Sequence, residues 1–105
     1  MNAQIKKGIL EMCILQILIK EELYGYDIMK KMNEHFPEVN ESTFYSILRR
    51  LNKDGATETY LGEVSNGPKR KYYKVTDYGR SKLNEDVRSW KQINVIMTDL
   101  GIDLL

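Results

Sequence analysis

Residues 41–76 read ESTFYSILRRLNKDGATETYLGEVSNGPKRKYYKVT, and the spacing of their apolar side chains changes halfway along. Within residues 44–51 the apolar side chains stand at i, i+3, i+4 and i+7, which is the spacing of one helix face. Asn40 or Ser42 can cap the start of this helix, and Gly55 suits the left-handed conformation at its end. The stretch therefore opens with a predicted amphipathic helix.

A two-residue alternation replaces the helical spacing in the second half of the stretch. Residues 57–61 and 71–75 are rich in threonine, tyrosine and other strand-forming residues, so they predict two strands. The sequence Ser-Asn-Gly-Pro at residues 65–68 is a turn cluster between them. Together the two strands and the turn predict a β-hairpin that follows the helix directly.

The segments on both sides of this stretch predict three further helices. Apolar residues recur every four positions in residues 3–20, and a second helical face runs from residue 26 to residue 35 and ends before a proline. Residues 23–25 read as a break between these two helices. After the hairpin, a long apolar stripe predicts a last helix, which Thr76 or Asp77 caps.

The predicted order is helix, helix, helix, hairpin and long helix. Three helices followed by a hairpin make the winged helix-turn-helix layout, in which the third helix enters the DNA major groove. We therefore expect a mainly helical α+β fold, with a DNA-binding winged helix-turn-helix domain at residues 1–76 and a dimerisation helix at residues 77–105. The first helix is expected to contribute to the dimer as well.

The charges are distributed unevenly along the chain, although the net charge is only +1. Residues 41–76 contain seven basic and four acidic side chains, a net charge of +3, and the segments on either side each have a net charge of −1. A basic centre of this kind is typical of a nucleic-acid footprint. The alternative is an ordinary solvated face, because charged runs are common on protein surfaces.

Side chains able to contact DNA gather in two parts of this basic centre. Small hydroxyls near the start of the third helix can donate to phosphates, and arginines further along can reach base edges or phosphates. The basic run before and within the second strand can neutralise phosphates. The candidate DNA-binding residues are Ser42, Thr43, Tyr45, Ser46, Arg49, Arg50, Lys53, Lys69, Arg70, Lys71 and Tyr72.

Residues 23–79 resemble the PadR family of bacterial transcriptional regulators. The stretches that carry the resemblance are LYGYDI at 23–28, ESTFYSILRRL at 41–51 and GPKRKYYKVT at 67–76, with Gly79 after them. The resemblance implies a homodimeric repressor whose last helix is swapped or packs against the first helix of the partner. With one helix after the hairpin, the chain resembles the short class, which includes LmrR-like multidrug-sensing regulators.

The last predicted helix carries an apolar stripe that three short helices cannot cover. A symmetric dimer would bury it, with contributions from the first helix. The expected dimerisation residues are Ile5, Ile9, Leu83, Val87, Trp90, Ile93, Met97 and Leu100.

Trp90 lies in the middle of this stripe, so a nearby two-fold axis would bring two indoles toward each other. Facing indoles would form a slot for a flat aromatic compound, and the resemblance implies that LmrR-like members use an aromatic residue on this helix in this manner. The expected ligand-binding residues are Met12, Gln16, Leu83, Val87, Trp90 and Asn94. The alternative is that Trp90 is a packing residue of the dimer core.

Several functional classes are disfavoured by what the sequence lacks. One cysteine excludes an intrachain disulfide, and one cysteine with one histidine argues against a structural zinc site. The sequence contains no glycine-rich phosphate loop and no Ser/His/Asp set, so we expect no enzyme and no cofactor. The absence of a signal peptide and of a long apolar run predicts a cytoplasmic protein without a membrane segment.

The sequence thus predicts a dimeric, sequence-specific DNA-binding transcriptional regulator, a repressor that a small aromatic ligand releases from a two-fold operator. Its expected partners are double-stranded DNA, a second copy of itself and a flat aromatic small molecule. The alternative function is a winged-helix protein-interaction module that senses no ligand.

Overall fold

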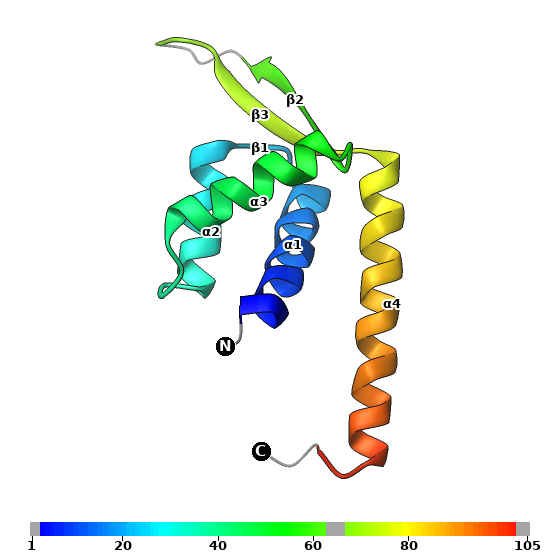
Figure 1. Ribbon diagram of the computed structural model, residues 1–105. Helices are drawn as coiled ribbons and strands as arrows, with labels where there is room; N and C mark the ends of the chain where they lie inside the picture. Colours follow the sequence, from blue (N-terminus) through cyan, green and yellow to red (C-terminus); the bar gives the residue numbers. More distant parts are fainter. Residues whose placement is uncertain (1–2, 63–66, 103–105) are drawn as a thin grey trace.

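The computed structural model describes residues 3–62 and 67–102, with side chains from residue 7 onward within these ranges. In this part of the chain the elements are α1 (Ala3–Lys20), β1 (Leu23–Tyr24), α2 (Gly25–His35), α3 (Glu41–Lys53), β2 (Thr57–Gly62), β3 (Arg70–Val75) and α4 (Asp77–Asp99). Figure 1 shows α4 running beside α1 and extending past it, while the β2–β3 hairpin projects from the opposite end of the molecule.

The predicted helices and hairpin are confirmed, and the fold is the mainly helical winged helix-turn-helix that the spacing predicts. Of the two candidate caps for α3, the N-cap position falls on Asn40, which makes no side-chain capping hydrogen bond. The predicted turn at residues 65–68 lies partly outside the described residues.

One strand is missing from the prediction. Residues 23 and 24, which the sequence presents as a break between helices, form β1 and pair antiparallel with β3, Leu23 opposite Tyr73 and Tyr24 opposite Tyr72. The strand order is therefore β1-β3-β2. Two residues are too few to produce a visible alternation, and the partner strand lies almost fifty residues further along the chain, so local spacing could not reveal this pairing.

The hydrophobic core lies between α1, α2, α3 and the base of the sheet. α1 is its centre, because apolar side chains from most of its circumference are buried against the other elements. α4 adds one fully buried apolar side chain, Leu83, near its start. The buried apolar residues are Leu10, Ile14, Leu15, Leu18, Leu23, Ile28, Met29, Met32, Val39, Phe44, Ile47, Leu48, Leu51, Ala56 and Leu83.

A tight junction joins the end of α3, the hairpin and the start of α4. The Thr76 hydroxyl accepts a hydrogen bond from the Gly79 backbone N–H at 3.0 Å, which caps α4, and donates one to the Gly55 carbonyl at 2.6 Å. A Cβ atom at Gly79 would lie 2.0 Å from the Ala56 carbonyl oxygen, so only glycine permits this approach. Gly55 itself has a φ of 85°, as its predicted role at the helix end requires.

Candidate nucleic-acid interface

α3 separates its apolar and polar side chains onto opposite faces. Its four apolar residues are buried in the core, and the polar residues of the other face are exposed. The exposed candidates on α3 are Ser42, Thr43, Tyr45, Ser46, Arg49 and Lys53. The hydroxyls occupy the first half of the helix and the cations the second, so donors for phosphates or base edges extend along its whole length.

The Arg50 guanidinium pairs with Glu11 of α1. The same carboxylate is 3.7 Å from the Lys82 ammonium of α4, and Lys82 also bridges Asp86 at 3.1 Å. The Glu11 side chain is only 16% exposed, so this network is partly shielded from water. Arg50 therefore joins α3 to α1, and because its side chain is still 34% exposed, its expected contact to DNA stays a prediction.

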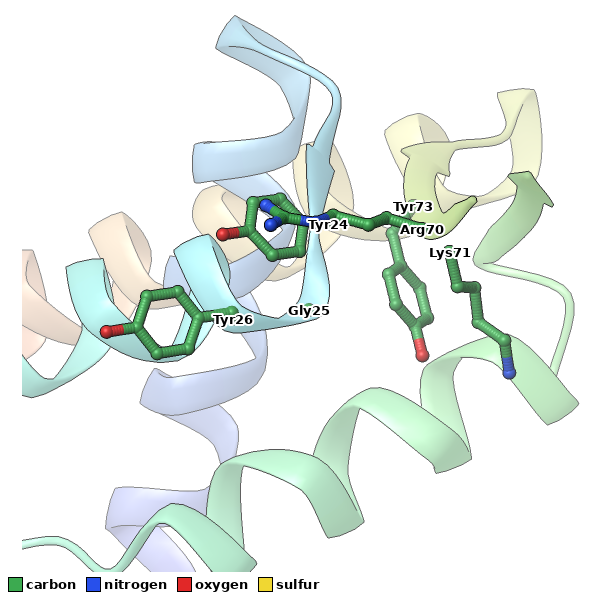
Figure 2. A pocket seen from close by; sticks show the side chains of 6 residues that line it. All are labelled: Tyr24, Gly25, Tyr26, Arg70, Lys71 and Tyr73. Atoms are coloured by element: carbon green, nitrogen blue, oxygen red, sulfur yellow. The ribbon is translucent and has the colours of Figure 1, made fainter. Parts of the chain in front are cut away.

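The strand alternation divides the predicted basic run of the wing, a name we use for residues 57–62 and 67–75. Arg70 and Tyr72 lie on the outer face of the sheet, whereas Lys71 and Tyr73 extend toward α3, as Figure 2 shows for Arg70, Lys71 and Tyr73. Lys69 is exposed just before β3. Neighbouring strand residues point to opposite faces, so the three cations do not form one surface.

Tyr72 packs among other tyrosines in this arrangement, and its expected contact to DNA stays a prediction. Its ring stacks on that of Tyr60 with centroids 5.5 Å apart and meets the ring of Tyr24 edge-on at 5.9 Å. The Tyr60 hydroxyl donates a 2.7 Å hydrogen bond to Glu22, and the Tyr24 and Tyr26 rings stack at 6.0 Å. The outer face is thus covered by a row of tyrosines.

Tyr73 is one of four tyrosines, with Tyr24, Tyr45 and Tyr72, whose hydroxyls the sequence suggests as contacts to phosphate. Burial raises the pKa of Tyr73, the Tyr45 phenol raises this pKa further, and the Arg49 charge lowers it. A Cβ atom at Gly25 would lie 3.8 Å from the rings of both Tyr45 and Tyr73, so these two rings lie close together. Tyr73 lies two residues after Lys71, on the same face of the strand. We call Tyr45, Arg49, Lys71 and Tyr73, with the exposed polar residues of α3, the α3–wing surface.

A second candidate site is an apolar hollow of about 410 Å³ between α1, the end of α2 and α4. Four of the six expected ligand-binding residues line it, namely Met12, Gln16, Leu83 and Val87. The other five lining residues are Cys13, Ile17, Met32, His35 and Phe36.

Trp90 and Asn94, the remaining two, lie further along α4 and do not line this hollow. Asn94 donates a 3.2 Å hydrogen bond to the Trp90 carbonyl, and the Trp90 side chain is 50% exposed. In the hollow itself, burial raises the pKa of the Cys13 thiol, because the thiolate charge is poorly solvated there.

The expected dimerisation stripe remains largely uncovered beyond Val87. Trp90, Ile93 and Leu100 are exposed, and Met97 is half-buried. On α1, Ile9 is half-buried, whereas the side chain of Ile5 lies outside the described residues.

Two further observations concern the described part of the chain. Its His, Cys, Asp and Glu side chains form no group of three or more that could hold a metal ion. None of its helices is both long enough and apolar enough to cross a membrane.

Comparisons with known proteins agree with this geometry. The model of the Transcriptional regulator PadR-like family matches residues 14–85. A crystal structure of a PadR-like transcriptional regulator from Bacillus cereus is 42% identical and superposes with a TM-score of 0.81, covering 93% of this chain and 96% of that one. A PadR-like transcription factor from Bacteroides fragilis is 40% identical with a TM-score of 0.80, covering 94% and 96%.

A curated relative, a transcriptional regulator of Mycobacterium tuberculosis, is 27% identical over 90 residues, covering 86% of this chain and 83% of the relative. The family match covers more than half of the chain and includes α2, α3 and the wing. The resemblance to PadR regulators is thereby confirmed. The chain belongs to the PadR-like family of transcriptional regulators, which are DNA-binding proteins and not enzymes.

Proposed function

We propose that the chain is a homodimeric repressor that binds a two-fold DNA operator and leaves it when a flat aromatic ligand binds. In this proposal residues 1–76 contact DNA and residues 77–105 join the two copies. The observation that carries it is the exposed polar and basic face of α3, which Lys71 and Tyr73 of the wing extend.

The dimensions and chemistry of α3 support DNA binding. Its 13 residues make a helix of about 20 Å, and the major groove of B-DNA is about 12 Å wide, enough for one helix. Arg49 can form a bidentate pair with guanine, while the serine and threonine hydroxyls can donate to phosphates. Lys69 and Lys71 would add contacts to the flanking backbone, which strengthen binding to any sequence.

The uncovered stripe of α4 supports a dimer. Burying one Ile or Leu side chain contributes about 1.5–3 kcal/mol, and this stripe leaves Ile93 and Leu100, together with Trp90, half exposed or more. A second copy related by a two-fold axis would cover the same stripe with an identical one.

The apolar hollow supports ligand sensing. Trp90 lies one helical turn beyond Val87, so a partner helix packed on the stripe would place aromatic side chains at the open end of the hollow. A flat ligand inserted there would change the spacing of α1 and α4. Such a change would alter the distance between the two copies of α3, so that they no longer match the fixed spacing of the two operator half-sites.

The DNA-binding proposal is tested with duplexes selected from a random pool by the wild-type protein. We expect Arg49→Ala to weaken binding roughly ten- to hundredfold, because one bidentate base contact contributes about 1–3 kcal/mol. Lys69→Ala should weaken binding to selected and random duplexes alike. The matched control is Arg88→Ala, an exposed arginine on α4, and none of the three should change the melting temperature.

Wild-type affinity in both variants would show that α3 and the wing are not the interface. Binding to an acidic protein partner with no binding to duplex DNA would favour the protein-interaction module instead.

The ligand proposal is tested through the single tryptophan of the chain. Flat cationic and phenolic aromatics should quench Trp90 fluorescence saturably and release the operator at the same concentrations. Gln16→Ala, which changes the wall of the hollow, should weaken both effects together. If none of these compounds quenches the fluorescence, Trp90 is a packing residue of the dimer, and the release of DNA by a ligand is no longer part of the proposal.

A further inference from the structure

The apolar hollow between α1, the end of α2 and α4 lies beside the ion pairs of Glu11. On α1 the lining residue Met12 directly follows Glu11, and on α4 the lining residue Leu83 directly follows Lys82. Successive helix residues point about 100° apart, so each helix borders the hollow with one flank and carries an ion-pairing side chain on the adjoining flank. A change in the spacing of α1 and α4 at the hollow therefore also acts on the ion pairs.

α3 is attached to both of these helices near its end. Arg50, in the last turn of α3, pairs with Glu11 of α1. Just beyond α3, the Ala56 carbonyl accepts a 3.1 Å hydrogen bond from the backbone N–H of Thr76, the residue that caps α4. In the described part of the chain, Arg50–Glu11 is the one ion pair between α3 and another element. A helix with two such attachments takes its tilt from the relative position of α1 and α4.

Lys82 and Arg50 differ in how easily they can leave Glu11. Lys82 is 3.7 Å from Glu11 but 3.1 Å from Asp86 of its own helix, so it keeps a partner when α4 moves away from α1. The Glu11 side chain is 16% exposed, and without Arg50 as well it would be a poorly solvated carboxylate with no cation beside it. The contact between Lys82 and Glu11 is therefore the weaker of the two.

We infer that Glu11 is a positioning residue, which acts through Arg50 and converts the filling of the apolar hollow into a tilt of α3. The inference rests on the proposed function and names the regulation of the same ligand site. An occupant that separates α1 from α4 opens the contact between Lys82 and Glu11. Glu11 then moves Arg50 with α1, while the hydrogen bond at Ala56 holds the end of α3 to α4. The exposed face of α3 is thereby turned relative to the groove that it enters.

A small displacement is sufficient for this effect. Arg50 and Ala56 lie roughly 9 Å apart along the chain direction of α3, given a helical rise of 1.5 Å per residue. A displacement of about 1 Å across the helix axis between these two attachments tilts α3 by about 6° and moves its start by about 1–2 Å, given the same rise. Packed interfaces amplify shifts of this size, because they have discrete arrangements and do not deform continuously.

Cys13 allows the hollow to be filled with a defined group. It lines the hollow and is the one cysteine of the chain. Benzyl methanethiosulfonate attaches an aromatic ring to the thiol through a disulfide, and methyl methanethiosulfonate attaches a small group by the same chemistry as the control. Mass spectrometry checks that the reaction is complete, and a reductant removes either group again. If the reagents do not reach the thiol, Cys13→Phe fills the same space.

The first measurement uses the free protein and needs no DNA. Amide NMR signals of residues 49–54, at the end of α3, are compared between the benzyl and the methyl forms. We expect a shift in the wild type and in Lys82→Gln, which keeps the pair of Arg50 with Glu11, and less than half of that shift in Glu11→Gln. Equal shifts in the wild type and Glu11→Gln would overturn the inference, and so would an equal loss of the shift in both variants.

The second measurement is the ratio of the DNA dissociation constants of the benzyl and methyl forms on the selected duplex. Each protein is compared with itself, so a change in its own affinity cancels. We expect a ratio of roughly ten for the wild type and Lys82→Gln, and below about two for Glu11→Gln. Melting temperatures of the methyl forms show whether each protein is folded. Arg50 is left unchanged, because its substitution would also remove its expected contact to DNA.

The two measurements separate this inference from the proposed function. A tenfold ratio in Glu11→Gln as well would overturn the inference, although release of DNA by a ligand would stand. Signals of α3 that respond through Glu11 in a protein that binds no duplex would support the inference and contradict the proposed function. A wild type in which the benzyl group changes neither the α3 signals nor the DNA affinity would overturn the inference without any variant.

Discussion

In α4, residues 77–87 lie against α1, whereas residues 88–99 extend past it, as Figure 1 shows. Apolar side chains recur at helical spacing in both halves. In the first half Leu83 is 3% exposed and Val87 packs against the core, but in the second Trp90 is 50% and Ile93 is 53% exposed. Helical spacing therefore identifies an apolar face in both halves, but it does not tell which part of that face the chain itself buries.

The two halves also differ in how their charges are paired. In the first half Lys82 lies between Glu11 of α1 and Asp86 of α4. Burial of Lys82 opposes its charge, but the hydrogen bond from Lys82 to Asp86 and the charges of Asp86 and Glu11 outweigh this and raise the pKa of Lys82. Among the described residues, no ion pair involves a side chain of the second half. The first half is fixed to its own chain by packing and charge together.

The largest expected effect is that of Leu83→Ala. This change removes a buried side chain and leaves a cavity, so the free energy of unfolding should fall by about 3 kcal/mol. Urea unfolding at several protein concentrations measures it, and the loss should be the same at each concentration. A loss below about 1 kcal/mol would mean that the first half of α4 is not part of the core.

The next largest expected effect is that of a substitution in the second half of α4. In the proposed dimer, Ile93→Ala should raise the dissociation constant roughly tenfold or more, because each copy would lose apolar area that its partner covers. Sedimentation equilibrium measures this constant, and unfolding of the diluted protein should not change. The matched control is Val95→Ala, which removes an exposed apolar side chain outside the stripe. Equal dissociation constants for Ile93→Ala and Val95→Ala would show that the stripe is not the interface.

Glu11→Gln should have a smaller effect on stability, about 1 kcal/mol, because its ion pairs are only partly buried. It leaves Arg50 and Lys82 without their shared carboxylate, so α3 loses one of its attachments to α1. We expect a several-fold loss of DNA affinity that Glu85→Gln, on the exposed side of α4, does not reproduce. Unchanged DNA affinity of Glu11→Gln would show that these ion pairs do not determine the orientation of α3.

The smallest effect is a pH dependence. Because the pKa of Lys82 is raised in the folded chain, its contribution is fully present below the unfolded-state pKa and is lost as the pH rises through the folded-state pKa. Stability should therefore fall at alkaline pH by less than about 1 kcal/mol from this residue. Unfolding curves of the wild type and Lys82→Met should converge above the folded-state pKa, and a constant difference between them would contradict the assignment.

Local spacing predicted most of the fold, because four helices and a hairpin each carry their own periodic pattern. It could not predict β1, whose partner strand is distant in sequence. The same limit applies to Arg50, since its partner Glu11 lies 39 residues away and no local pattern marks the pair. Strand alternation predicts that Arg70 and Lys71 lie on opposite faces of β3. Grouping the two residues by their charge alone did not show this.

The contact between Gly79 and the Ala56 carbonyl has a mechanical consequence. α4 contains 23 residues and is about 34 Å long, and this contact fixes one end of it to the end of α3. α4 is therefore a long helix anchored at one end, next to α3. A tilt of roughly 10° about this anchored end moves the far end of α4 by about 6 Å, given a rise of 1.5 Å per residue. Conversely, a displacement of several ångströms at the far end corresponds to a small rotation of α4 at its junction with α3. The close contact of Gly79 with Ala56 limits how far the two helices can slip against each other at this junction.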